Sequence, residues 1–85
     1  MSRIGDMVGD IARALADDPE AVRVVEGEHR GVTVVDVYMA EGDLGRVIGR
    51  QGRTAGAVRT LAAVAGEQLG HKVQVEFRDG RPPGA

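Results

Sequence analysis

Two segments with the character of β-strands, separated by a helix-like stretch, constrain the fold of this chain more than any other feature of its sequence. The run VTVVDVYM, residues 32–39, is rich in β-branched residues, and Val73, Val75 and Phe77 alternate with polar side chains. Residues 42–69 between them have helical periodicity. A helical crossover of this length normally brings the chain back parallel to the strand that it left, with right-handed sense. We therefore expect the two segments to be parallel strands of one sheet.

Hydrophobic periodicity and turn residues predict the elements before this crossover. Residues 4–15 place apolar side chains at helical spacing with charged ones between them, which predicts an amphipathic helix. The Asp-Asp-Pro sequence that ends at Pro19 should stop this helix, because proline disfavours a helical conformation of the residue before it. Residues 22–25 predict a short strand and residues 26–31 a polar turn, so the short strand forms a hairpin with residues 32–39.

The crossover itself is predicted to contain two helices. A short helix over residues 42–48 is followed by a loop, residues 49–52, and by a longer helix from Arg53 to about Leu69. Gly70 is placed to end the longer helix in a left-handed conformation. The apolar stripe predicted for the longer helix, widened by Leu61, consists of Ala55, Val58, Ala62, Ala65 and Leu69.

The predicted order is helix-strand-strand-helix-helix-strand, which is an α+β fold. We expect a three-stranded mixed sheet with the three helices on one face and solvent on the other, which suits the polar Gln74, Glu76 and Arg78. A chain of 85 residues has room for one small domain. We place this single domain at residues 1–78, with its core in 30–78, and expect residues 79–85 to be a flexible C-terminal tail.

Several kinds of function are disfavoured by what the sequence lacks. The absence of cysteine excludes disulfides and thiolate metal sites and fits a reducing cytosol. No stretch approaches the roughly 20 apolar residues that span a bilayer, and the N-terminus does not resemble a signal peptide. The only serine is Ser2, and no threonine has an evident base, so we expect no enzymatic activity. The expected protein is cytoplasmic, with no membrane contact, small-molecule substrate, cofactor or metal.

Positive charge is concentrated in one part of an acidic chain. The net charge is −2, yet the segment from Leu44 to Gly66 contains four arginines and no acidic residue. Arginine suits forked contacts to phosphate, although an arginine excess is also expected of a GC-rich genome. The four arginines of this segment are Arg46, Arg50, Arg53 and Arg59.

The loop between the two crossover helices combines glycine with this charge. Gly49 and Gly52 can adopt positive φ and permit close approach of another backbone. Arg53 begins the longer helix, whose first-turn amides and dipole favour an anion. With Arg46 and Arg50 also nearby, the predicted ligand is a phosphodiester backbone. The alternative is a connection shaped by packing alone, and Arg59 is expected to lie on a solvated helix face.

Other nucleotide-binding patterns do not match. A P-loop needs two glycines five positions apart before Lys and Ser or Thr, and no two glycines between Gly42 and Gly70 have this spacing. A dinucleotide fingerprint needs glycines two positions apart, which occur nowhere in the chain. Modules that stack bases on sheet aromatics need an aromatic platform, and this chain has only Tyr38 and Phe77.

The sequence VIGRQGRT, residues 47–54, resembles the GXXG signature of the KH domain, and the element order is that of the type II KH fold. The wider GRVIGRQGRTAGAVRTL, residues 45–61, and DDPEAV, residues 17–22, are similar to the KhpA family of bacterial single-KH-domain RNA-binding proteins. The resemblance implies that the loop clamps about four nucleotides of single-stranded RNA. It also implies a set of binding residues: Arg46, Val47, Ile48, Gly49, Arg50, Gln51, Gly52 and Arg53.

The roles implied for these residues differ. Gly49 and Gly52 would bend the loop, and Arg50 and Gln51 would reach phosphates. Val47 and Ile48 would anchor the preceding helix in the core and floor the groove.

Two further features of the groove follow from the same resemblance. Val35 and Val37 are additional candidates for the floor, although alternation leaves their face open. The chain departs from the KH pattern at Ala55, where an aliphatic residue is usual, and Gly56 follows it. This departure implies a shallower groove and a lower affinity.

Resemblance to the family also implies a physiological role. Its members act with a partner KH-containing protein, KhpB, as RNA chaperones or post-transcriptional regulators, and in some bacteria are linked to cell-wall organisation and cell shape. The expected partners are therefore single-stranded RNA and a KhpB-like protein or a second copy of the chain. The alternative is a protein-interaction or dimerisation module that uses the same surfaces or an exposed hairpin edge.

Overall fold

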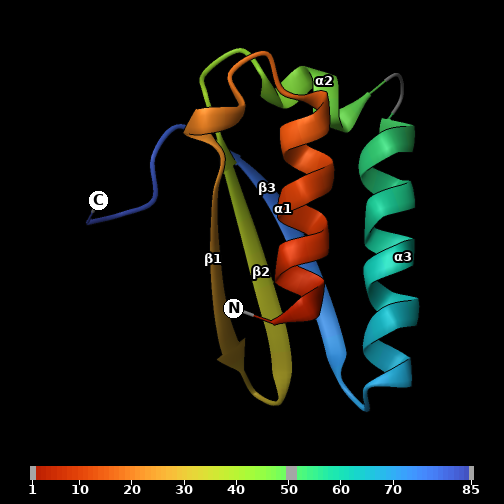
Figure 1. The fold of residues 1–85 in the computed structure, drawn as a ribbon. Helices are drawn as coiled ribbons and strands as arrows, with labels where there is room; N and C mark the ends of the chain where they lie inside the picture. Colours follow the sequence, from red (N-terminus) through yellow and green to blue (C-terminus); the bar gives the residue numbers. More distant parts are fainter. Residues whose placement is uncertain (1, 50–51, 85) are drawn as a thin grey trace.

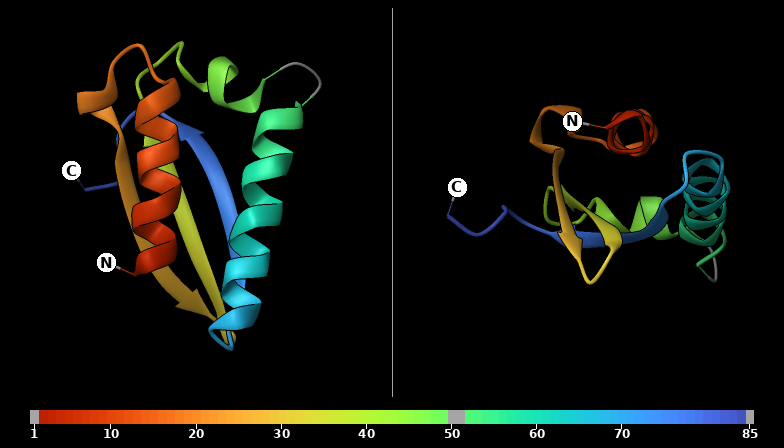
Figure 2. Two further views of the ribbon diagram at one scale, coloured as in Figure 1. Left: turned by 45° about the vertical axis from the view of Figure 1, so that its right-hand side comes forward. Right: turned by 90° about the horizontal axis from the view of Figure 1, so that it is seen from below.

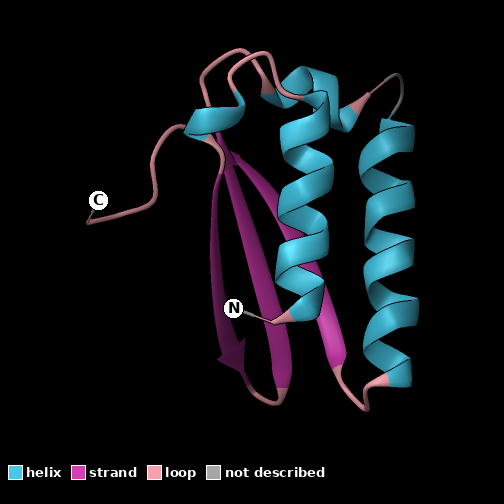
Figure 3. Ribbon diagram, in the orientation of Figure 1, coloured by secondary structure: helices cyan, strands magenta, loops and turns pink. Residues whose placement is uncertain are grey.

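The β-branched segment VTVVDVYM forms the central strand of a three-stranded sheet. The computed structural model describes residues 2–49 and 52–84. In it, β2 (Val32–Met39) pairs antiparallel with β1 (Arg23–His29) and parallel with β3 (Lys72–Asp79), as Figures 1 and 3 show. The predicted mixed sheet and the parallel crossover are confirmed.

The hairpin between β1 and β2 is tighter than predicted. The prediction of a polar turn over residues 26–31 was wrong, because Glu26 pairs with Val35 and the strand continues to His29. Only Arg30 and Gly31 turn the chain, with φ of 52° and 79°. Positive φ at both positions matches the right-handed twist of the flanking strands. Polar residues here belong to an edge strand, where solvent is available to their side chains.

The helices form where the periodicity places them. α1 (Arg3–Leu15) begins at a Ser2 cap whose Oγ accepts a hydrogen bond from the Gly5 amide at 3.1 Å. A 3₁₀ turn, η1 (Pro19–Ala21), follows it, and α2 (Leu44–Ile48) and α3 (Arg53–Gln68) form the crossover. Among the described residues, no helix has the length and apolar character needed to cross a membrane.

The helices are not all placed as predicted relative to the sheet. Figures 1 and 2 show α1 and α3 side by side on one face of the sheet, while the short α2 lies across the end where β2 finishes. The α+β class is confirmed, but two helices rather than three cover the face. Five residues give α2 a length of about 7.5 Å, too short to cover a sheet.

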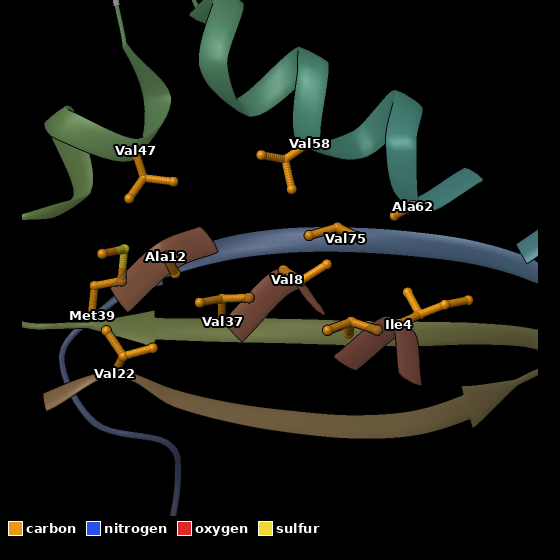
Figure 4. Packing of buried hydrophobic residues seen from close by; sticks show 11 residues of the cluster. Ile4, Val8, Ala12, Val22, Val37, Met39, Val47, Val58, Ala62 and Val75 are labelled. Carbon is orange, nitrogen blue, oxygen red and sulfur yellow. The ribbon is translucent and has the colours of Figure 1, made fainter. Parts of the chain in front are cut away.

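The hydrophobic core lies between this helix pair and the sheet. Its buried side chains come from β2 and β3, from the inward faces of α1 and α3, from α2, and from Val22 just before β1 (Figure 4). Among the residues with no exposed surface, or almost none, are Val8, Ala12, Val22, Val35, Val37, Met39, Val47, Ala62 and Val75.

The apolar stripe of α3 is confirmed in part. Ala55, Val58 and Ala62 are buried, whereas Leu61 and Leu69 are 54% and 48% exposed, so the stripe is narrower than predicted. It is completed by Gly66, which is buried against the start of β3.

The end of α3 is built as the sequence predicts. Gly70 has φ 78°, its amide donates to the Glu67 carbonyl, and the His71 amide donates to the Gly66 carbonyl at 2.8 Å. These two bonds form a Schellman motif, which satisfies carbonyls at the helix end.

The sheet continues beyond the predicted domain end at residue 78. β3 ends at Asp79, and the Gly80 amide then donates to the Met39 carbonyl at 2.7 Å. The first residues of the predicted tail are therefore held against the sheet, and the flexibility of the rest stays a prediction.

Candidate nucleic-acid interface

The loop between α2 and α3 is shaped by glycine conformations. Gly49 has φ 72° and ψ 179°, and Gly52 has φ 72° and ψ 14°. The first combination is adopted almost only by glycine, and the second is left-handed. The Gly52 amide donates to the Gly49 carbonyl at 3.2 Å and closes the turn. The positive φ expected at both positions is present.

Gly49 is also required by packing. A Cβ at this position would lie 2.4 Å from Oγ1 of Thr54, whereas a Cβ at Gly52 would have nothing within 4 Å. The backbone at Gly49 therefore lies directly against the first turn of α3, whereas the position of a Cβ at Gly52 is open. This open position leaves room for another backbone.

The first turn of α3 is electrostatically suited to an anion. Gly52 is its N-cap and supplies no side-chain hydrogen bond, and no acidic residue lies in the first turn. The amides at a helix start carry partial positive charge, which is stabilised by a negative group. A phosphate placed over Gly52 would meet this end of the helix.

The binding residues expected from the sequence occupy different environments. Val47 has no exposed surface and points into the core with Met39 and Val58 (Figure 4), so it anchors α2 as predicted. Ile48 is 37% exposed, so it lies at the surface beside the loop and does not anchor the core as predicted.

The charged candidates of the loop lie at its borders. Arg46 belongs to α2, and Arg53 is the exposed first residue of α3. Arg50 and Gln51 lie outside the described residues.

Val35 and Val37 lie on the helix-covered face and have no exposed surface, so they do not floor a groove. Their alternation along β2 left the choice of face open, and the position of α1 decides it.

Arg59 is a feature that the sequence analysis missed. It was expected on a solvated face, but its Nε donates to the Val75 carbonyl at 3.1 Å and its guanidinium carbon lies 5.7 Å from the centre of the Phe77 ring. This distance is within the range of a cation–π contact. Because β3 is an edge strand, this side chain bridges α3 to the free edge of the sheet. Sequence spacing alone holds no signal for this tertiary contact.

The face of α3 that carries Arg59 leads from the loop to a hollow. Gly56, Arg59, Ala63 and Glu67 are separated by three or four residues and so share one side of the helix. The last two line a cavity of about 420 Å³ together with the start of β3. We call this side of α3, with the neighbouring edge of β3, the α3–β3 groove. The residues that line the hollow are Thr60, Ala63, Val64, Glu67, His71, Lys72 and Val73.

A helix, a GXXG loop and a second helix inserted between two parallel strands of such a sheet define a KH domain. The chain matches the model of the KhpA/KhpB KH-domain family over residues 5–77 and belongs to that family.

The chain is also similar over most of its length to relatives from several bacteria. RNA-binding protein KhpA of Caldanaerobacter subterraneus is 41% identical over 74 residues, which cover 87% of this chain and 99% of the relative. RNA-binding protein KhpA of Mycobacterium bovis is 42% identical, covering 87% of this chain and 89% of the relative. The Bacillus subtilis protein of the same name is 39% identical, covering 87% and 91%.

Two solved structures have a similar fold at low sequence identity. Aquifex aeolicus Era bound to GDP and AlF4⁻ aligns with a TM-score of 0.59, and Era in complex with MgGDPNP and nucleotides 1506–1542 of 16S ribosomal RNA aligns with 0.61. Both are 18% identical, and this chain spans 31% of each. At this identity the likeness concerns the fold alone.

Proposed function

We propose that this protein binds single-stranded RNA, with the strand's phosphates seated on the loop 49–52 and the first turn of α3. The observation that carries the proposal is the loop geometry, in which Gly49 packs on Thr54 while Gly52 faces open space. Support comes from the acid-free, arginine-containing segment around the loop and from relatives named RNA-binding protein KhpA. The proposed activity is binding and not catalysis.

Each candidate residue has a role in this proposal. The backbone at Gly49 and Gly52 admits the phosphodiester chain, and Arg50 and Gln51 reach its phosphates. Arg46 and Arg53 add positive charge, which strengthens binding through counterion release. Ile48 offers an exposed apolar contact beside the loop, and Val47 holds α2 in place.

Bases are proposed to lie along the α3–β3 groove, which can accommodate about four nucleotides. Stacking on an aromatic platform is not available there, because Tyr38 belongs to the uncovered side of the sheet and Phe77 is covered by Arg59. We assign the stacking role to the guanidinium of Arg59, whose second face is available to a base while the first lies over Phe77.

The groove is shallow near the loop. Ala55 is buried and a Cβ at Gly56 would meet nothing within 4 Å, so neither residue gives the groove a large apolar wall. Weak binding by a single domain follows. A second RNA-binding subunit would raise the effective concentration of the strand and hence the affinity.

For this reason we infer that the protein acts as an RNA chaperone or post-transcriptional regulator together with a KhpB-like protein or a second copy of itself. The family description, which joins KhpA and KhpB, supports the first partner. Exposed Leu61 and Val64 on α3, together with the unpaired edge of β1, support the alternative of a dimerisation module. The cytoplasmic location and the links to cell-wall organisation and cell shape stay predictions.

A charge reversal in the loop tests the proposal. In Arg50→Asp/Gln51→Asp we expect a stable fold and loss of binding to single-stranded RNA, since phosphate would meet two carboxylates. Binding of the unaltered protein should weaken steeply with salt, by a log–log slope of roughly −0.7 per phosphate contact.

A matched pair of single variants controls for the change of charge. Arg50→Asp places the new carboxylate in the loop, and Arg30→Asp places it in the hairpin turn. The hairpin variant should bind RNA as the unaltered protein does. Unchanged RNA binding by the double loop variant, with its fold intact by circular dichroism, would contradict the proposal and favour the dimerisation module.

A further inference from the structure

We propose that the protein has a second phosphate-binding site for the same RNA strand, in a cavity between η1, the connection from β2 to α2, and the C-terminal tail. We call this cavity the tail pocket and define it by Arg23, Ala40, Glu41, Gly80 and Arg81. Its volume is about 540 Å³. The inference rests on the proposed RNA binding, but the site lies outside the loop and the α3–β3 groove.

Two arginines give the tail pocket its character. Within the part of the chain that the structure describes, neither Arg23 nor Arg81 forms an ion pair with a carboxylate. Glu41 is the single acidic residue of the lining. The pocket therefore carries an excess of one positive charge, in the form of guanidinium groups that can each grip a phosphate with two donors.

The Arg23 guanidinium is held by backbone carbonyls near the pocket, and the backbone just before Arg81 is held against the sheet. Nη1 of Arg23 donates to the carbonyls of Glu20 and Val22, at 2.5 and 2.9 Å, which fixes the guanidinium while its described bonds leave Nε and Nη2 to a ligand. Arg81 follows Gly80, whose amide is bonded to the Met39 carbonyl at the end of β2. A guanidinium that is positioned in advance loses less entropy when an anion binds.

An aromatic side chain beside the tail pocket favours a nucleic acid over a protein carboxylate. The strand register places Tyr38 opposite Arg23 on one side and Arg78 on the other, on the uncovered face of the sheet. Nε of Arg78 donates a hydrogen bond to Oδ1 of Asp36 at 3.0 Å and forms an ion pair with it, which raises the pKa of the guanidinium. The positive charge of Arg78 is therefore already paired with a carboxylate. Tyr38 is thus available for a base next to a phosphate held by Arg23, the combination typical of single-strand binding surfaces.

One RNA strand can reach both the loop and the tail pocket. Both lie at the end of the sheet where β2 and β3 finish, with the loop beside α3 and the tail on the opposite side (Figure 1). The short α2 and the end of α1 with its connection to η1 lie at this end of the molecule, whose longest extent is 34 Å (Figure 1). RNA longer than the groove can hold would therefore continue from the loop to the tail pocket.

The test compares two lengths of oligouridylate on the full chain. One has about four nucleotides, which the groove alone can hold, and the other about twelve. For Arg23→Gln/Arg81→Gln we expect affinity for the longer oligomer to fall about tenfold and its salt slope to decrease by about 0.7, the value for one phosphate contact. Affinity for the shorter oligomer should not change.

Two further variants check the sign of the charge effect and the role of the aromatic ring. Glu41→Gln removes the one carboxylate of the tail pocket and should raise affinity for the longer oligomer only. Tyr38→Leu should lower that affinity, and Tyr38→Phe should preserve it, because stacking needs the ring and not the hydroxyl. All these side chains lie at the surface or partly so, and thermal unfolding will show that each variant is folded.

The outcomes separate this inference from the proposed function. If Arg23→Gln/Arg81→Gln lowers the affinity for both oligomers equally, or leaves the affinity for the longer oligomer unchanged, the tail pocket is not an RNA site. Either result leaves the loop proposal intact. Loss of binding to a polyglutamate peptide, without any change in RNA affinity, would also overturn it and assign the pocket to an acidic protein partner. Failure of the unaltered protein to bind either oligomer would contradict the proposed function itself.

Discussion

At the scale of single residues, the two loop glycines are required for different reasons. Gly49 combines a backbone conformation that is almost exclusive to glycine with contact to Thr54, whereas Gly52 is left-handed and has open space where a Cβ would be. The first glycine is therefore fixed by the fold. The second combines a left-handed turn with open space beside it.

Alanine substitutions should separate these two requirements. Gly52→Ala should cost about 1 kcal/mol of unfolding free energy, from left-handed strain alone. Gly49→Ala should cost more, about 2–3 kcal/mol, because the added Cβ also contacts Thr54. Urea denaturation measures both free energies. Equal costs for the two variants would show that the packing at Gly49 does not matter.

Arg59 supports a prediction about the groove. Arg59→Lys keeps the charge but removes the planar guanidinium that lies over Phe77, so affinity for a short single-stranded RNA should fall by about fivefold or more, as expected when a stacked base is lost. Arg13→Lys, on the exposed side of α1, is the matched control and should leave the affinity unchanged. Titrations followed by fluorescence anisotropy measure the affinities, and wild-type binding by the Arg59 variant would exclude the stacking role.

At the scale of elements, the close contact between α3 and β3, which forms the α3–β3 groove, depends on Gly66. A Cβ at Gly66 would lie 2.6 Å from Cγ2 of Val73 and 2.8 Å from the His71 carbonyl oxygen. The C-terminal part of α3 can therefore approach the strand closely, which closes that end of the groove around the hollow.

Two glycines of α3 should respond in opposite directions to alanine. Gly66→Ala should destabilise the protein by about 1–3 kcal/mol, because a backbone atom and a β-branched side chain would have to move. Gly56→Ala has no neighbour to meet and should stabilise it by about 0.5–1 kcal/mol through helix propensity. Thermal denaturation of the two variants measures both effects, and a loss of stability in Gly56→Ala would contradict the open position of this residue.

Local pattern was sufficient for some elements and insufficient for others. The run at residues 32–39 and the Gly70 helix end were predicted because β-branching and a left-handed cap are properties of a few adjacent residues. The length of β1 was underestimated because the polar Glu26 and Glu28 lie on an edge strand, and pairing with β2 overrides their turn preference. Leu61 was placed in the core because periodicity does not show how wide a helix face the neighbouring elements cover.

At the scale of the whole molecule, an acidic protein concentrates arginine in one continuous segment of its chain. The segment from Leu44 to Gly66 carries four arginines and no acidic residue, and it contains α2, the loop and most of α3. The sequence predicted this region and the loop within it. The contact of Arg59 with β3 and the tail pocket depend on residues far apart in the chain, so only the folded structure brings them together.

The seating of a phosphate strand on the loop 49–52 and the start of α3 is tested most directly by nuclear magnetic resonance. A uniformly ¹⁵N-labelled sample is titrated with single-stranded RNA of about four nucleotides, the length expected for one KH groove. We predict that the backbone amides of Gly49, Gly52 and Arg53 shift most, and that those of Arg30 and Gly31 in the hairpin turn do not shift. The largest shifts on β1 or in the hairpin, with the loop amides unmoved, would contradict the account.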